Sequence, residues 1–148
     1  MIIGRRFLSI ALGLLFVSAW ALAQAKPAQP APSAPAAPSL YKRLGGYDAI
    51  AAVTDEFIAQ FAADKQLNRF LVGLSDSSKG RLRQLVVEQI CQATGGPCVY
   101  IGRDTKTAHK GLGITVSDWD LSVQHLVAAL EKFKVPQKEK DDLLAIVA

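Results

Sequence analysis

The chain has 148 residues, half of them hydrophobic, with a formal net charge of +4 and two cysteines. This length is enough for one domain with a hydrophobic core. The charge is too small to indicate nucleic-acid binding, and no basic stripe with interleaved aromatic residues is present. The sequence also lacks a Ser/His/Asp or Cys/His arrangement, a phosphate-binding glycine loop and a paired-carboxylate motif, which sets hydrolase readings aside.

The N-terminal segment has the pattern of a secretory signal peptide. Arg5 and Arg6 precede an apolar run over residues 7–23, and alternating alanines near its end give A-x-A cleavage sites. We expect residues 1–25 to be removed on export to the periplasm or the cell exterior, which leaves no membrane span and lowers the net charge from +4 to +2. A single-span anchor is the alternative, but so short a run ending in A-x-A favours cleavage.

Residues 26–38 consist of Ala, Pro, Ser and Gln with one charged residue, which predicts an extended linker. Residues 39–148 are the predicted domain. Apolar residues recur there at three- and four-residue spacing without strand alternation, so we expect an all-α fold. The first helix is predicted over 39–44 and ends at Gly45-Gly46, and the second ends near Ala63. The apolar stripe of this second helix comprises Ile50, Val53, Phe57 and Phe61, widened by Ile58 and interrupted by Thr54.

After a short turn with Leu67, Phe70 and Leu71, the third helix is predicted over 76–94 and is stopped by Gly95-Gly96-Pro97. A loop and a brief helical turn with His109 follow, closed by Gly111 and Gly113. Ser117 with Asp120 predicts a capping box for the next helix, and Pro136 opens the last one. The expected packed faces of these two helices are Trp119, Val123, Leu126, Leu130 and Phe133, then Leu143, Leu144, Ile146 and Val147.

Cys91 and Cys98 lie at the end of the third helix and in the loop after it. Export to an oxidising compartment makes a disulfide possible, and it would close a small ring around Gly95-Gly96-Pro97. The alternative is one half-buried and one solvent-facing cysteine, because geometry decides the pairing and sequence does not show geometry. A zinc site is not indicated, since no partnering CxxC or paired histidine spacing is present.

His109 is one of two histidines and lies on a short polar segment between two amphipathic helices, where a small fold can place a metal ligand. The other, His125, lies beside the apolar stripe of its helix and is interpreted as a flanking or surface residue.

Five motifs in a fixed order make residues 39–148 resemble a group I truncated haemoglobin. They are the segments 39–46 (SLYKRLGG), 63–67 (ADKQL), 95–102 (GGP with Tyr100 and Gly102), 108–115 (AHKGLGIT) and 135–136 (VP). The resemblance implies an all-α, two-over-two helical sandwich that encloses haem b, with His109 as the proximal iron ligand. It also makes Lys106 and Lys110 candidates for pairing with haem propionates, and Tyr100 and Arg103 candidates at the haem edge.

The same resemblance implies an apolar distal pocket. The family usually has a tyrosine after the phenylalanine in the middle of the second helix, whereas this chain has Phe57-Ile58. Val86 stands where the family often has glutamine. The expected wall comprises Phe57, Ile58, Phe70, Leu71, Leu82, Val86 and Ile90. If the third helix shifts by one turn, Gln84 or Gln89 enters the pocket instead.

These observations predict an exported globin that reversibly binds the diatomic gases O2, NO and CO at a five-coordinate or water-bound iron, with nitric oxide binding, sensing or detoxification as its use. An apolar pocket offers bound oxygen no hydrogen bond, so we expect fast oxygen dissociation and easy autoxidation. One alternative is a haem redox enzyme, such as a nitric oxide dioxygenase or a weak peroxidase, which needs a reductase or other electron donor. Another is a haem-free interaction module.

Overall fold

Six α-helices and one 3-10 turn make up residues 37–147, the part of the chain that the computed structural model describes, and no strand occurs within this range. The predicted signal peptide and residues 26–36 of the predicted linker lie outside the described residues. Within residues 37–147, no helix is both long enough and apolar enough to cross a membrane. The elements are α1 (Leu40–Arg43), α2 (Gly46–Ala63), η1 (Asn68–Phe70), α3 (Asp76–Ala93), α4 (Thr105–His109), α5 (Val116–Lys132) and α6 (Gln137–Val147).

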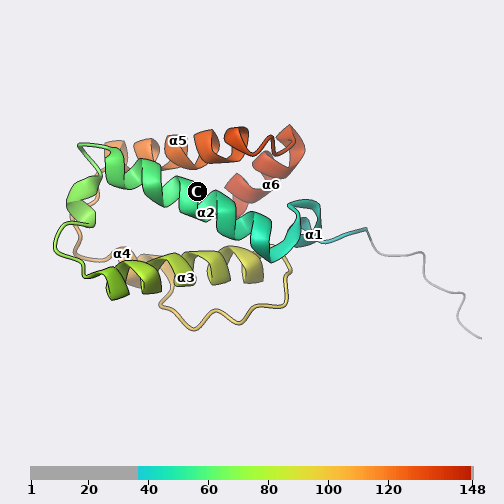
Figure 1. The fold of residues 1–148 in the computed structure, drawn as a ribbon, viewed down its shortest axis with the longest axis horizontal. Coiled ribbons are helices and arrows are strands. Elements are labelled where there is room, and N and C mark those ends of the chain that lie inside the picture. Colours follow the sequence, from blue (N-terminus) through green and yellow to red (C-terminus); the bar gives the residue numbers. More distant parts are fainter. Residues whose placement is uncertain (1–36, 148) are drawn as a thin grey trace, which may run out of the picture. The chain divides into compact units, whose positions relative to one another are not determined.

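The long helix α2 lies between α3 and α5 and packs against both, as Figure 1 shows. The short helix α1 contacts α2 and α6. Arg43 of α1 strengthens the second of these contacts, because its guanidinium donates to Glu139 and to Asp142 of α6 at 2.6 Å each. This arrangement leaves α4 outside the closely packed helices, on the chain between α3 and α5.

The hydrophobic core joins α2, α3, α5 and α6 with Leu40 of α1. Its buried members are Leu40, Ile50, Ala51, Val53, Val87, Ile90, Cys91, Ala129, Leu130 and Leu143. Thr54, which interrupts the apolar stripe of α2, is buried as well, and its hydroxyl has no hydrogen-bond partner among the described residues. Two expected core residues are instead exposed: Phe133 follows the last residue of α5, and Ile146 lies on the outer side of α6.

Side chains cap the N-termini of four helices. The hydroxyls of Ser39 and Ser75 cap α1 and α3, and the carboxylate of Asp104 caps α4. The predicted cap of α5 is wrong by two residues. Thr115 is the N-cap, with Asp118 completing the capping box, whereas Ser117 lies inside the first turn.

Cys91 and Cys98 form a disulfide, with their Cα atoms 5.8 Å apart. The chain turns within this ring at Gly95, whose φ of +82° is easily adopted only by glycine. Gly96 then packs tightly against α1 and the disulfide: a Cβ atom there would lie 2.5 Å from Cδ2 of Tyr41 and 2.7 Å from Sγ of Cys91. The disulfide is therefore fixed against the core at its α3 end.

Candidate functional site

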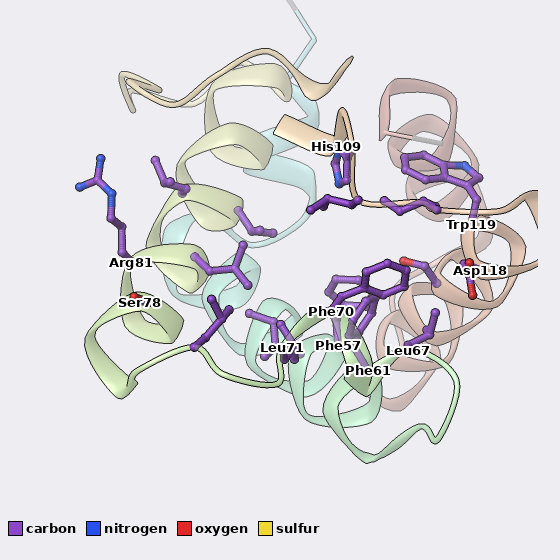
Figure 2. Close-up of a pocket in the computed structure, with 18 residues that line it drawn as sticks. Phe57, Phe61, Leu67, Phe70, Leu71, Ser78, Arg81, His109, Asp118 and Trp119 are labelled. Carbon is purple, nitrogen blue, oxygen red and sulfur yellow. The ribbon is translucent and has the colours of Figure 1, made fainter. Parts of the chain in front are cut away.

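A cavity of about 490 Å³ opens on the side of the fold away from α1 and α6. Its walls come from α2, the η1 turn, α3 as far as Val86, the chain around His109 and the first turns of α5. Figure 2 shows side chains from these segments converging on one space, with phenylalanine rings of α2 and η1 on one side and His109 on the other. Most of the lining is aliphatic or aromatic, so the cavity suits a large apolar ligand.

His109 is the only imidazole among the residues that line this cavity, and its ring points into it (Figure 2). Its Nδ1 lies 2.8 Å from the carbonyl oxygen of Thr105, one turn earlier in α4. A carbonyl oxygen can only accept, so Nδ1 carries the proton and Nε2 keeps its lone pair for a metal. The indole of Trp119 meets the imidazole edge to face, with ring centroids 5.7 Å apart. One hydrogen bond and one aromatic contact therefore orient the ring.

Asp118 connects the α5 wall of the cavity to the wall formed around η1 through hydrogen bonds. Its carboxylate accepts hydrogen bonds from the backbone and hydroxyl of Thr115, from Gln66 at 2.8 Å and from Arg69 at 2.7 Å. These donors, led by the Thr115 backbone N–H, hold the pKa of Asp118 far below its ordinary value even though the side chain is only 2% exposed. Because Gln66 precedes η1 and Arg69 lies within it, Asp118 fixes that turn to the start of α5.

Four aliphatic side chains line the part of the cavity formed by α2 and α3. Ile58 of α2 and Leu82, Leu85 and Val86 of α3 supply only hydrocarbon there. The polar lining residues of α3 are Ser78 and Arg81, and Figure 2 shows the guanidinium of Arg81 directed away from the other labelled side chains. A small ligand held between His109 and this wall is therefore surrounded by apolar groups.

The structure brings together seven of the ten residues that the sequence suggested for cofactor binding, namely Phe57, Ile58, Phe70, Leu71, Leu82, Val86 and His109. Ile90, Tyr100 and Lys106 do not line the cavity. Ile90 is buried in the core. Each four-residue step along an α-helix rotates the side-chain direction by about 40°, so two such steps turn Ile90 away from the face of Leu82. The Tyr100 hydroxyl donates to the carbonyl of Arg103 at 2.6 Å, and Lys106 is exposed on α4.

Neither glutamine of the alternative α3 register lines the cavity. Gln84 contacts the hydroxyl of Tyr47 and donates to Glu88, and Gln89 donates to Thr105 at 3.0 Å, so neither amide enters the cavity. His125 lies away from the cavity, where its Nε2 is 3.1 Å from Oδ2 of Asp64.

Sequence reasoning missed several lining residues. They are Phe61, Leu67, Leu74, Ser78, Arg81, Leu85, Leu112, Ile114, Asp118, Trp119 and Ser122. Phe61 and Trp119 were predicted on packed faces of helices, so the available signal was their position on the same stripes as Phe57 and Leu126. Leu112 and Ile114 flank Gly113 just after His109, and only the three-dimensional path of that segment brings them to the cavity.

Solved structures with this arrangement are two-over-two globins. The 2/2 hemoglobin from Synechococcus sp., solved in the cyanomet state with covalently attached heme, superposes with a TM-score of 0.68 at 29% identity over 74% of this chain and 90% of that one. The truncated hemoglobin from Tetrahymena pyriformis has the same fold, with a TM-score of 0.68 at 22% identity over 74% of this chain and 92% of that one. The fold and its cavity therefore define an all-α protein of the truncated, two-over-two globin class.

Sequence comparison gives the family. The model of the bacterial-like globin family matches residues 39–148. The group 1 truncated hemoglobin GlbN of Mycolicibacterium paratuberculosis is 36% identical over 110 residues, which cover 74% of this chain and 79% of that protein. The corresponding protein of Synechocystis sp. is 32% identical over 114 residues, covering 74% and 86%. The chain belongs to the bacterial-like globins and, among them, to the group 1 truncated haemoglobins.

Globins bind haem and, through its iron, diatomic gases. The residues present here fit that group. The cavity is large and mainly apolar, as a porphyrin face requires, and one imidazole with a free Nε2 lone pair points into it. His109 would hold that group, and haem would supply an iron atom able to bind a small ligand.

Proposed function

We propose that this protein is an exported globin that binds haem b through Nε2 of His109 and takes up diatomic gases on the opposite face. The observation that carries the proposal is the orientation of His109: the Thr105 carbonyl holds the proton on Nδ1, and the ring points into the cavity. A hydrogen bond of this kind fixes the tautomer and makes the free nitrogen a better ligand.

The apolar wall decides which gas is retained. Bound oxygen carries partial negative charge and is stabilised by a nearby donor, whereas carbon monoxide and nitric oxide depend less on such support. Ile58, Leu82, Leu85 and Val86 provide no donor. Oxygen therefore dissociates fast and the ferrous iron autoxidises readily, which favours nitric oxide as the physiological ligand over storage of oxygen. The same lack of a polar group gives no support to a dioxygenase or peroxidase role.

Two observations support export to the periplasm or the cell exterior. The N-terminal sequence has the charge, apolar run and A-x-A pattern of a signal peptide. The Cys91–Cys98 disulfide belongs with an oxidising compartment, since such bonds are rare in the reducing cytosol.

The test is an absorption spectrum of protein purified after expression of the full chain and supplied with haem, in the ferric, ferrous and gas-bound states. We expect a Soret band typical of a histidine-ligated globin, and its loss or replacement by a weakly bound haem spectrum in His109→Ala. His125→Ala is the matched control, because it removes the other histidine outside the cavity. A wild-type spectrum in His109→Ala, or no Soret band in any variant, refutes the proposal.

A further inference from the structure

The segment that carries His109 contains no buried residue that could fix it in place. Thr94 at the end of α3 and Asp118 in α5 are buried, and no residue between them is. His109 lies in the middle of this stretch, on a five-residue helix. Isolated helices of this length do not hold together in water. The position of His109 must therefore be set by a few specific bonds and contacts to the rest of the domain.

The bonds that hold the segment N-terminal to His109 are all made to the second half of α3. The disulfide joins Cys98 to Cys91, the backbone N–H of Tyr100 donates to the Gln92 side chain at 2.6 Å, and Gln89 donates to Thr105 at 3.0 Å. Both hydrogen bonds involve exposed residues, where water competes with each partner. Only the disulfide is independent of that competition.

The disulfide is well placed to act as an anchor that a reductant can release. Cys91 is fully buried, and Gly96 and Tyr41 pack against it, so the α3 end is fixed. Cys98 is half-buried and begins the exposed part of the segment. A thiolate from solvent can reach Cys98 far more easily than Cys91, and access of this kind controls thiol–disulfide exchange.

We propose that the Cys91–Cys98 disulfide is a redox-controlled anchor for the haem-ligating segment: the oxidised protein retains haem, and reduction by a dithiol releases it faster. A thiolate of the dithiol attacks Sγ of Cys98, and Cys91 leaves and takes up a proton. The second thiol of the reductant then displaces Cys98, which also leaves as a thiol, and the reductant departs as a cyclic disulfide. This inference rests on the proposed function, because His109 must hold haem for its release to matter.

The first test measures transfer of ferric haem from the full-length protein to an excess of apomyoglobin. We expect loss to be roughly ten- to a hundredfold faster in Cys98→Ser, and in wild type reduced with dithiothreitol, than in oxidised wild type, the range typical when a group that orients a metal ligand is removed. Cys98→Ser leaves the buried Cys91 in place, and the reduced wild type covers the case in which the variant folds poorly.

Arg43→Ala is the control for a general loss of stability. It breaks the ion pairs to Glu139 and Asp142 between α1 and α6, far from His109 along the fold. We expect a lower melting temperature with haem loss within about twofold of wild type. Equal acceleration in Arg43→Ala and Cys98→Ser would overturn the proposal, because haem loss would then follow global stability alone.

A second measurement follows amide hydrogen exchange in the haem-free protein before and after reduction. Exchange should accelerate across residues 99–113 and stay unchanged in α2 and α5. Cooperative loss of helix on reduction, or unchanged exchange in 99–113, contradicts the inference. So does equal haem loss from oxidised and reduced protein. Absence of a Soret band in oxidised wild type is a different result, since it refutes the haem globin itself.

Discussion

The indole of Trp119 meets the imidazole of His109 edge to face, with ring centroids 5.7 Å apart and ring planes at 85°. Trp119 is the one tryptophan among the described residues, and it lines the cavity. A haem group held by His109 would therefore bind close to this indole. We expect stoichiometric haem addition to quench the emission of Trp119 almost completely by energy transfer to the porphyrin, which a fluorescence titration measures.

The second tryptophan of the chain, Trp20, lies in the predicted signal peptide, so a Trp20→Phe variant isolates the emission of Trp119 if that segment is retained. His109→Ala should weaken the quenching and raise the haem concentration required for it. Full emission at saturating haem would mean that the porphyrin binds elsewhere.

The helices could be predicted from the sequence because their signals are local. Gly45 and Gly95, both with positive φ, follow α1 and α3 at the predicted stops, and Ser39 caps α1 within its own turn. The N-cap residue of α5 could not be identified from local sequence signals. Thr115 and Ser117 are each followed by aspartate three residues later, so two capping boxes overlap. The structure uses Thr115 because Gln66 and Arg69 bind Asp118, a contact between segments about fifty residues apart.

The candidate site was predictable where family motifs or helix stripes identify a position, as for His109 and Phe57. It was not predictable where the direction of a side chain depends on packing. Ile90 shares an apolar face with Val86 in the sequence, yet it packs in the core against other helices. Tyr100 was a candidate at the haem edge; its side chain lies outside the cavity and its hydroxyl donates to the carbonyl of Arg103.

A hydrogen-bond donor introduced into the apolar wall should slow oxygen dissociation. Val86→Gln places an amide on the α3 wall of the cavity, where the bound gas would lie. A net gain of about 0.5–1.5 kcal/mol per hydrogen bond corresponds to roughly two- to twelvefold slower dissociation. Flash photolysis or stopped-flow mixing of the ferrous protein measures the rate.

The matched control for this change is Val86→Met, which adds similar bulk and flexibility without a donor. We expect its oxygen dissociation rate to stay near that of wild type and its autoxidation to remain fast. Equal slowing by glutamine and methionine would show that steric closure, and not polarity, governs oxygen retention.

The domain should lose stability in acid as the carboxylate of Asp118 is protonated. The pKa of its carboxyl is held far below the ordinary value of 3.8 by donors from Thr115, Gln66 and Arg69. Its contribution to the free energy of unfolding is therefore fully present above pH 4 or so and is lost as the pH falls below that. Asp118→Asn should melt several degrees lower than wild type at pH 7, and this difference should shrink toward pH 2 in thermal melts followed by circular dichroism.

Asp120→Asn provides the comparison for Asp118→Asn, because Asp120 is exposed on the same helix. It should reproduce the wild-type melting temperature across the whole pH range. A constant gap between wild type and Asp118→Asn from pH 7 to pH 2 would argue that the carboxylate charge contributes nothing and that only side-chain shape matters.

Truncating a core residue and truncating a cavity residue should differ in how the loss of stability depends on haem. Leu130 is 1% exposed in the core, so Leu130→Ala should lower the free energy of unfolding by roughly 2–5 kcal/mol, with or without haem. Leu112 lines the cavity, and 49% of its surface is exposed. Leu112→Ala should therefore change the haem-free protein by about 0.5 kcal/mol or less. With haem present it should cost more, because a ligand stabilises the native state according to its affinity, and the variant loses contact with the porphyrin. Urea unfolding of both variants with and without haem separates these cases, and an equal penalty for Leu112→Ala in both forms would exclude this residue from the haem contact.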